Sequence, residues 1–164
     1  MREVVAVLHN IRSVHNVGSV FRTADGAGVG KIYLCGITPS PLDRFGKFIP
    51  QFSKVSLGAE KHLEWEKIKS TPAVLKKLKT EGYKILAVEQ AKNSVLYYKS
   101  KSLDKARAKN KSRVALIFGA EVRGLPPSIL KLADEILEIP MFGKKESLNV
   151  SVAFGIVAYA LNQK

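Results

Sequence analysis

The run from Leu148 to Leu161 limits the possible folds most strongly, because nearly all of its residues are apolar. Its length is that of a helix, and a helix that is apolar on every face has to be buried. Small polar residues nevertheless stand at its start, where a helix leaves backbone N–H groups without partners: Ser147, Asn149 and Ser151. Ser147 would serve as an N-cap, but capping needs only one such residue. The surplus predicts a polar site at the mouth of an apolar pocket.

Apolar segments of strand length alternate with helical patterns along the rest of the chain. The expected strands are residues 4–8, 31–35, 83–88, 114–118 and 135–139. The expected helices are residues 17–27 with Asn16 as N-cap, residues 57–68 with Trp65, and residues 71–80. Near-continuous apolar strands that alternate with helices are typical of a parallel sheet whose two faces are both covered. The sequence therefore predicts an α/β fold with helices on both faces of a parallel sheet.

Two polar segments give weaker signals. Residues 36–54 are rich in proline and glycine, which predicts a surface loop. Residues 90–112 are rich in lysine with weak periodicity, so a loop, a frayed helix and a binding segment all stay open. The glycines between residues 26 and 30 follow a helix and precede a strand. Because a dinucleotide-binding loop has the reverse order, we interpret these glycines as the end of the helix.

Length and composition are those of an ordinary folded domain. With 164 residues, 46% of them hydrophobic, we expect residues 1–164 to form a single domain around one core. No apolar run reaches the length of a membrane span, and the first residues lack the cleavage region of a signal peptide. Cys35 is the only cysteine, and three scattered histidines give no metal-ligand spacing. We therefore expect a cytoplasmic domain with no membrane segment and no metal.

The distribution of charge bears on the binding partners. The chain carries 27 basic and 14 acidic residues, a net charge of +13. Residues 61–113 hold 15 basic and 5 acidic side chains, whereas residues 114–164 hold 5 of each. A local excess of this size favours binding to polyanions. RNA or DNA is the expected partner, and a lysine-rich solvated surface is the alternative.

Three segments combine unusual polar residues with the ends of expected strands, where ligands bind in open α/β sheets. The first contains Asn16 and Arg22, the second surrounds Glu121, and the third leads into the apolar helix. Each has a simpler structural explanation: Arg22 as a surface charge, Glu121 as a residue of a first helical turn, and Ser147 as a cap. Their joint occurrence in one basic domain favours a shared site.

These segments resemble the motifs of a known family. They read Asn16…Arg22-Thr-Ala-Asp, Phe118-Gly-Ala-Glu121-Val-Arg-Gly-Leu and Ile139-Pro-Met…Ser147-Leu-Asn149-Val-Ser. In this order and spacing they are similar to the three motifs of the SpoU/TrmH family of RNA ribose 2′-O-methyltransferases, in the SPOUT superfamily, over nearly the whole chain. The resemblance implies an α/β domain with a C-terminal deep trefoil knot, an exception to the rule against threaded chains. Val122 departs from the glycine that many members have there.

The resemblance also implies a cofactor and an assembly. S-adenosyl-L-methionine would bind in the knot, largely through backbone groups of the residues that match the family's cofactor contacts: Ile117, Phe118, Gly119, Ile139, Met141, Ser147 and Leu148. A homodimer would complete each active site across its interface. The separate N-terminal RNA-binding extension of larger members is not expected here, and the lysine-rich residues 61–113 would take its place.

The family's catalytic positions fall on Asn16, Arg22, Glu121, Ser147 and Asn149. The implied reaction removes the proton of a ribose 2′-OH in tRNA or rRNA while its oxygen attacks the methyl group of the cofactor. The family implies Arg22 as the base. Because a guanidinium stays protonated in proteins, we assign Arg22 an electrostatic role on a substrate phosphate and on the forming alkoxide. Asn16 would orient Arg22 or the ribose. Ser147 and Asn149 would hold ribose and cofactor, and Glu121 would position rather than titrate.

Three other functions stay open from the sequence. The first is methylation of a base, as in other SPOUT branches. The second is RNA binding by a related domain without activity, which the presence of all five catalytic positions disfavours. A generic nucleotide-binding domain is the least favoured, because no phosphate-binding glycine loop follows a strand.

Overall fold

The computed structural model describes residues 3–108 and 112–162. Seven strands form one sheet in the order β3-β2-β1-β6-β4-β7-β5, and every pairing is parallel. The strands are β1 (Glu3–His9), β2 (Lys31–Cys35), β3 (Glu64–Ile68), β4 (Lys84–Val88), β5 (Val95–Leu96), β6 (Arg113–Phe118) and β7 (Glu135–Glu138). The five expected strands and the parallel α/β class are confirmed.

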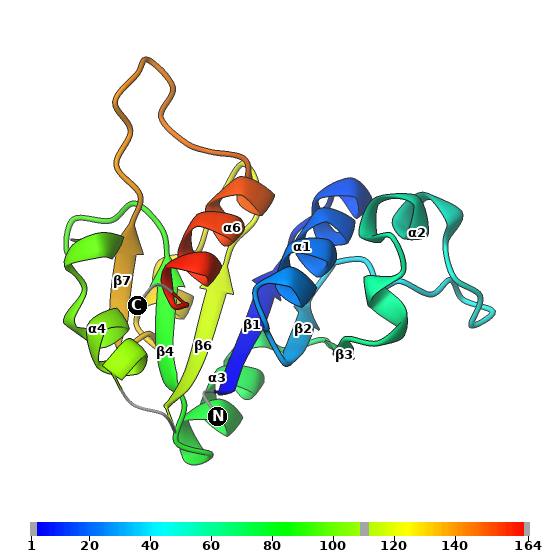
Figure 1. The fold of residues 1–164 in the computed structure, drawn as a ribbon, viewed down its shortest axis with the longest axis horizontal. Helices are drawn as coiled ribbons and strands as arrows, with labels where there is room; N and C mark the ends of the chain where they lie inside the picture. The colour runs from blue at the N-terminus through cyan, green and yellow to red at the C-terminus, as the bar shows by residue number, and fades with distance from the viewer. Residues whose placement is uncertain (1–2, 109–111, 163–164) are drawn as a thin grey trace.

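Helices cover both faces of the sheet (Figure 1). They are α1 (Val14–Gly26), α2 (Pro50–Ser56), α3 (Thr71–Thr80), α4 (Lys101–Ala108), α5 (Pro127–Leu130) and α6 (Val150–Ala160). Successive residues of a strand point to opposite faces. In β1, Ala6 and Leu8 join the core that contains residues of α1 and α6, whereas Val5 and Val7 join the core that contains residues of α3 and α5. Two buried cores therefore hold the helices on the sheet.

Helix α1 begins earlier than the sequence predicts. Its N-cap is Ser13, whose side chain accepts a hydrogen bond from the backbone N–H of Asn16 at 3.1 Å. The prediction of Asn16 as the cap is wrong, because Asn16 lies within the first turn and its side chain contacts other segments. The predicted apolar stripe of the helix is confirmed as buried: Val17, Val20, Phe21, Ala24 and Ala27.

The helix predicted over residues 57–68 is wrong. The chain there forms a short 3-10 helix, η1 (Ala59–Lys61), and then the strand β3, which contains Trp65. Among the strands that the structure describes, β3 lies at the edge of the sheet and has β2 as its single neighbour. Lys31 of β2 forms ion pairs with Glu64 at 2.8 Å and with Glu66 at 3.0 Å. Cross-strand pairs stabilise a strand through a partner distant in sequence, so the local pattern of residues 57–68 does not reveal it.

The two weakly patterned segments contain short elements. The loop predicted over residues 36–54 extends as far as α2, which begins at Pro50. The lysine-rich residues 90–112 contain β5, a short 3-10 helix η2 (Tyr97–Lys99) and α4; residues 109–111 lie outside the described part. Of the alternatives for this segment, a helix is therefore present at residues 101–108. The strand β5, which was not predicted, lies at the edge of the sheet beside β7.

Helix α6 is not enclosed as the sequence predicts. One side packs on α1 and β6, where Phe154 and Val157 are buried. The other side is uncovered, and Val152 and Tyr159 are each 50% exposed. The prediction of full burial is wrong for the single chain, because only one side of this largely apolar helix meets other described elements.

In the described ranges, no group of three or more His, Cys, Asp or Glu side chains is placed to hold a metal ion. None of the helices among those residues has both the length and the apolar character that crossing a membrane requires.

Cys35 provides a test of the sheet. The residue is fully buried at the end of β2, and burial raises the pKa of its thiol to about 11. Because the thiolate is the reactive species, we expect iodoacetamide at about pH 8 to leave the folded protein unmodified and to label it rapidly in urea. Mass spectrometry of the intact chain measures the labelling. Rapid modification without urea would contradict the burial of β2.

Candidate active site

A pocket of about 460 Å³ lies where the neighbouring strands β6, β4 and β7 end. Its lining consists of residues 88–90, 118–124 and 147–150, together with Ile139, Met141 and Ala153. The carboxyl ends of parallel strands meet at one edge of a sheet, and ligands of open α/β sheets bind there. All predicted cofactor contacts except Ile117 lie in this lining. Ile117 is fully buried in the core that contains residues of α3 and α5.

Two glycines shape one wall of the pocket. Residues 119–124 turn back on themselves, and the N–H of Gly124 donates to the carbonyl of Ala120 at 2.8 Å. A Cβ on Gly119 would overlap the backbone of Gly124 and of Leu125. Gly124 has a φ of +61°, and a Cβ there would overlap the carboxylate of Glu89. The wall is therefore built from closely packed segments in which neither glycine has room for a side chain.

Glu89 and Gln90 belong to the pocket, although they are not among the site residues predicted from the sequence. The Glu89 carboxylate accepts hydrogen bonds from the N–H of Gln90 at 2.9 Å and from the N–H of Leu125 at 2.8 Å. The Gln90 side chain donates to the carbonyl of Glu146 at 2.6 Å. The two residues thus tie the end of β4 to the other two segments of the lining. Their position directly after an apolar strand is the signal that could have identified them.

Three of the predicted catalytic residues form one chain of hydrogen bonds. The Asn16 amide donates to Oε1 of Glu121 at 3.1 Å, and its Oδ1 accepts from the Asn149 amide at 3.1 Å. Asn149 is also the N-cap of α6, because its Oδ1 accepts from the N–H of Ser151 at 2.8 Å. The cap expected at Ser147 is therefore formed by Asn149, and Ser147 lies exposed in the pocket lining. The network joins the starts of α1 and α6 to the 119–124 turn.

Glu121 is held in its ionised form. Partial burial opposes ionisation, but hydrogen bonds from its own N–H, from Asn16 and from the backbone of Arg12 and Ser13 outweigh it and lower the pKa of Glu121. The two backbone N–H groups lie 3.2 Å from the carboxylate oxygens. A carboxylate with a lowered pKa that accepts several hydrogen bonds is suited to positioning its neighbours.

The lowered pKa of Glu121 makes its contribution to stability depend on pH. The contribution is complete above the ordinary carboxyl pKa, about 4.3, and disappears as the pH falls through the lower value of the folded state. We expect urea unfolding at about pH 7 to give a smaller free energy for Glu121→Gln than for the wild type, and the difference to vanish once the pH is low enough to protonate Glu121 in the folded protein. Glu146→Gln, which removes an exposed carboxylate outside the network, is the control. An equal pH dependence in both variants would contradict the arrangement.

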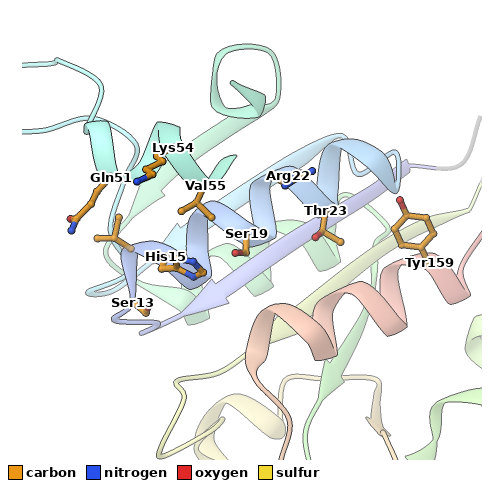
Figure 2. A pocket seen from close by; sticks show the side chains of 10 residues that line it. Ser13, His15, Ser19, Arg22, Thr23, Gln51, Lys54, Val55 and Tyr159 are labelled. Atoms are coloured by element: carbon orange, nitrogen blue, oxygen red, sulfur yellow. The ribbon is translucent and has the colours of Figure 1, made fainter. Parts of the chain in front are cut away.

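Arg22 lies in a different cavity from the other predicted catalytic residues. It is exposed on α1 and lines a cavity of about 1120 Å³ between α1, α2 and the end of α6 (Figure 2). Lys54 of α2 and Tyr159 of α6 contribute to the same lining. As far as the structure describes the chain, this lining and that of the pocket at the strand ends share no residue. One chain therefore brings Asn16, Glu121 and Asn149 together but leaves Arg22 apart from the pocket.

The cavity around Arg22 is suited to an anion. Its lining holds the cations Arg22 and Lys54 and, among the described residues, no carboxylate. His15 and Ser19 also line it, and both share a face of α1 with Arg22 because they precede it by seven and three residues. This spacing could have identified His15 from the sequence. Arginine and lysine together form charge-assisted hydrogen bonds to phosphate.

Comparison with known proteins matches residues 3–159 to the SpoU rRNA methylase family. The tRNA (guanosine(18)-2′-O)-methyltransferase of Aquifex aeolicus is 29% identical over 96% of this chain and 68% of its own length. The structure of an AdoMet-bound rRNA methyltransferase from Sinorhizobium meliloti superposes with a TM-score of 0.83 at 27% identity, over 98% of this chain and 56% of that one. A structure concerned with the 2-OH methylation of C/U34 on tRNA superposes with a TM-score of 0.76 at 28% identity, and the match covers 98% of this chain and 95% of that one.

The chain spans 68% of the length of the A. aeolicus relative and 57% of the length of a similar 23S rRNA (guanosine-2′-O-)-methyltransferase from Escherichia coli. The match nevertheless covers all three motifs and every element of the sheet. With its strand-end pocket and the network of Asn16, Glu121 and Asn149 inside the matched region, the chain belongs to the SpoU rRNA methylase family.

Proposed function

We propose that this protein transfers a methyl group from S-adenosyl-L-methionine to a ribose 2′-OH of RNA. The observation that carries the proposal is the hydrogen-bonded chain of Asn16, Glu121 and Asn149, which unites the three motif segments at the rim of the strand-end pocket. The similar protein from A. aeolicus is named a 2′-O-methyltransferase, and the similar structure from S. meliloti is AdoMet-bound.

The residues of the pocket fit this cofactor. Ile139 and Leu148 offer apolar surface for an adenine ring, and the turn of residues 119–124 adds a wall of closely packed backbone. We assign the contacts to the seven residues named from the sequence, with Ile117 contributing through its backbone: Ile117, Phe118, Gly119, Ile139, Met141, Ser147 and Leu148. When bound, the sulfonium of the cofactor supplies an activated methyl group.

The protein's own residues would orient the ribose and stabilise charge. Arg22, with Lys54 in the lining of the same cavity, binds a phosphate of the RNA. The Arg22 guanidinium also stabilises the alkoxide that forms as the hydroxyl proton passes to that phosphate or to water. Glu121 stays ionised and fixes Asn16, which in turn fixes Asn149. Ser147 and Asn149 hold ribose and cofactor at the pocket rim.

We further propose that the active form is a homodimer whose sites combine Arg22 of one subunit with the pocket of the other. Two observations support it. The uncovered side of α6, with Val152 and Tyr159 half exposed, offers apolar surface to a second copy. Arg22 lies in a cavity bordered by Tyr159 and separate from the pocket, so one chain alone does not place Arg22 over the cofactor.

Replacing Val152 with lysine is expected to dissociate the dimer and abolish transfer, because a charge would be buried at the centre of the interface. Sedimentation velocity measures the assembly. Leu57→Lys, which adds the same charge at an apolar residue that is 63% exposed outside α6, is the control and is expected to stay dimeric. If Val152→Lys sediments as the wild type does, α6 is not the interface.

A mixing experiment tests whether the sites are shared. Subunits with Arg22→Ala retain the pocket, and subunits with Gly119→Ala retain Arg22. The assay uses an S-adenosyl-L-methionine concentration that leaves the weakened Gly119→Ala pocket largely empty. If each site uses both subunits, mixed dimers then recover methyl transfer that neither variant shows alone. If each site lies within one subunit, mixing recovers nothing.

The substrate class is tested by transfer of labelled methyl groups to total bacterial tRNA and, separately, to rRNA, followed by nucleoside analysis. We expect a 2′-O-methylated nucleoside in the tRNA pool, because the similar structure concerned with tRNA matches this chain over 95% of its own length. A methylated product in the rRNA pool alone would identify rRNA as the substrate. A methylated base would assign the protein to another SPOUT branch, and absence of both transfer and cofactor binding would favour RNA binding without activity.

Two further expectations belong to this proposal. The chain leaves β7 at Glu138 and returns over β6 in α6, and we propose that this return threads the loop after β6 to form the trefoil knot. We also propose a cytoplasmic location, which the expected RNA substrate and the single reduced cysteine support.

A further inference from the structure

A short hairpin stands out from the body of the protein between β2 and α2. Leu42 and Phe48 form an antiparallel bridge, and the residues between them make the turn. Figure 1 shows the segment between β2 and α2 reaching outward past α2, at the side of the molecule away from β7. The hairpin therefore presents its tip to solvent.

The turn is held in one conformation. The Asp43 carboxylate accepts hydrogen bonds from the N–H of Phe45 at 2.8 Å and from the N–H of Lys47 at 3.0 Å. The backbone N–H of Asp43 donates to the carbonyl of Lys47 at 2.8 Å. Gly46 has a φ of +73°, which glycine adopts without strain. A rigid tip loses little conformational entropy when it binds a ligand.

This tip exposes an aromatic ring among cations. Phe45 is 71% exposed, and the guanidinium of Arg44 lies 4.7 Å from the centroid of its ring. Lys47 adds a second cation, and Lys61 lies 5.8 Å from the ring centroid of Phe48 at the base of the hairpin. The only carboxylate between Leu42 and Phe48 is that of Asp43, which already binds the turn. An aromatic ring flanked by cations is the combination with which proteins hold unpaired bases of nucleic acids.

The hairpin leads directly to the cavity around Arg22. Its last residue, Phe48, is followed closely by α2, and Gln51 and Lys54 of α2 line that cavity. A nucleic-acid strand whose phosphate is bound by Arg22 and Lys54 could therefore extend along α2 to the hairpin.

We propose that Phe45 is a stacking platform for an unpaired base of the RNA substrate, with Arg44 and Lys47 contacting the phosphates beside that base. The inference rests on the proposed function in that it takes RNA as the substrate. An exposed phenylalanine could instead make an apolar contact with a protein partner, and the two uses differ in which side chains can replace phenylalanine. Stacking needs a planar ring, whereas an apolar contact tolerates leucine.

Three substitutions at one position separate these uses in the methyl-transfer assay. Phe45→Ala and Phe45→Leu are expected to raise the KM for RNA roughly tenfold, because stacking contributes about 1–3 kcal/mol per base. Phe45→Trp is expected to keep the wild-type KM. In all three variants kcat at saturating RNA and the Kd for S-adenosyl-L-methionine are expected to stay unchanged. A Phe45→Leu enzyme with the wild-type KM would overturn the proposal.

A second readout does not depend on methyl transfer. Tryptophan fluorescence of Phe45→Trp is titrated with single-stranded oligoadenylate and with its duplex with oligouridylate, and the wild type, which contains only Trp65, is the matched control. We expect quenching by the single strand, none by the duplex, and none in the wild type. Absence of quenching by the single strand would overturn the stacking role. If the wild type transfers no methyl group but quenching occurs, the proposed function fails while the stacking role stands.

Discussion

Replacing Arg22 with alanine is expected to abolish methyl transfer and to leave cofactor binding intact. Arg22 is the cation that the cavity on α1 presents to a phosphate, and a fixed positive charge is the means of stabilising an alkoxide as it forms. Loss of one such group lowers kcat by about 10²–10³-fold in enzymes where it has been removed. The Kd for S-adenosyl-L-methionine should not change, because Arg22 is not part of the strand-end pocket. Single-turnover transfer and calorimetry measure the two quantities.

Two further variants sharpen this prediction. Arg22→Lys keeps the charge but loses the planar fork of donors, so we expect partial activity. Lys131→Ala removes an exposed cation just after α5 that lines neither cavity, and is expected to be neutral. Near-normal turnover in Arg22→Ala would remove Arg22 from the mechanism.

The fold could be predicted where sequence and structure share a local cause. Helix α3 is an example, because proline stands in its first turn and Gly82 follows its end, and the predicted bounds agree with the observed ones. β3 could not be predicted in this way. It is an edge strand of five residues, Glu64–Ile68, that lacks a regular alternation of charged and apolar residues, and its ion pairs come from Lys31 on β2. Such pairing is specified by distant residues, which no local pattern contains.

The site divides in the same way. The rule that ligands bind where parallel strands end leads to residues 118–121 and 139–149, and of these residues 118–121, 139, 141 and 147–149 line one pocket. Applied to every strand, the same rule would also have identified Glu89 and Gln90 after β4. The sequence identifies Asn16 as a site residue but predicts the wrong local role for it. Ser13 caps the helix instead, which leaves the Asn16 side chain free to reach Glu121 and Asn149. That Arg22 lies in a separate cavity depends on how α1 packs against α2 and α6, which the sequence does not specify.

A single added methyl group at Gly119 is expected to disrupt the pocket. The Cβ of Gly119→Ala would overlap backbone atoms of Gly124 and Leu125. These atoms cannot shift freely, because Gly124 donates to Ala120 at 2.8 Å and Leu125 donates to Glu89 at 2.8 Å. Steric overlap of this kind costs about 1–3 kcal/mol of folding free energy. Because the displaced turn is a wall of the pocket, we also expect the affinity for S-adenosyl-L-methionine to fall by at least about tenfold.

Gly143 offers the matched control, because the same glycine-to-alanine substitution can be made there, in the loop between β7 and α6. A Cβ at Gly143 meets nothing within 4 Å, and its φ is not in the left-handed region. Gly143→Ala should therefore fold and bind the cofactor as the wild type does, with a gain in stability of up to about 1 kcal/mol from the less flexible unfolded chain. Urea unfolding and calorimetric titration of both variants measure the difference. If Gly119→Ala also binds normally, the 119–124 turn can move aside without loss, and a rigid backbone wall is not what holds the cofactor.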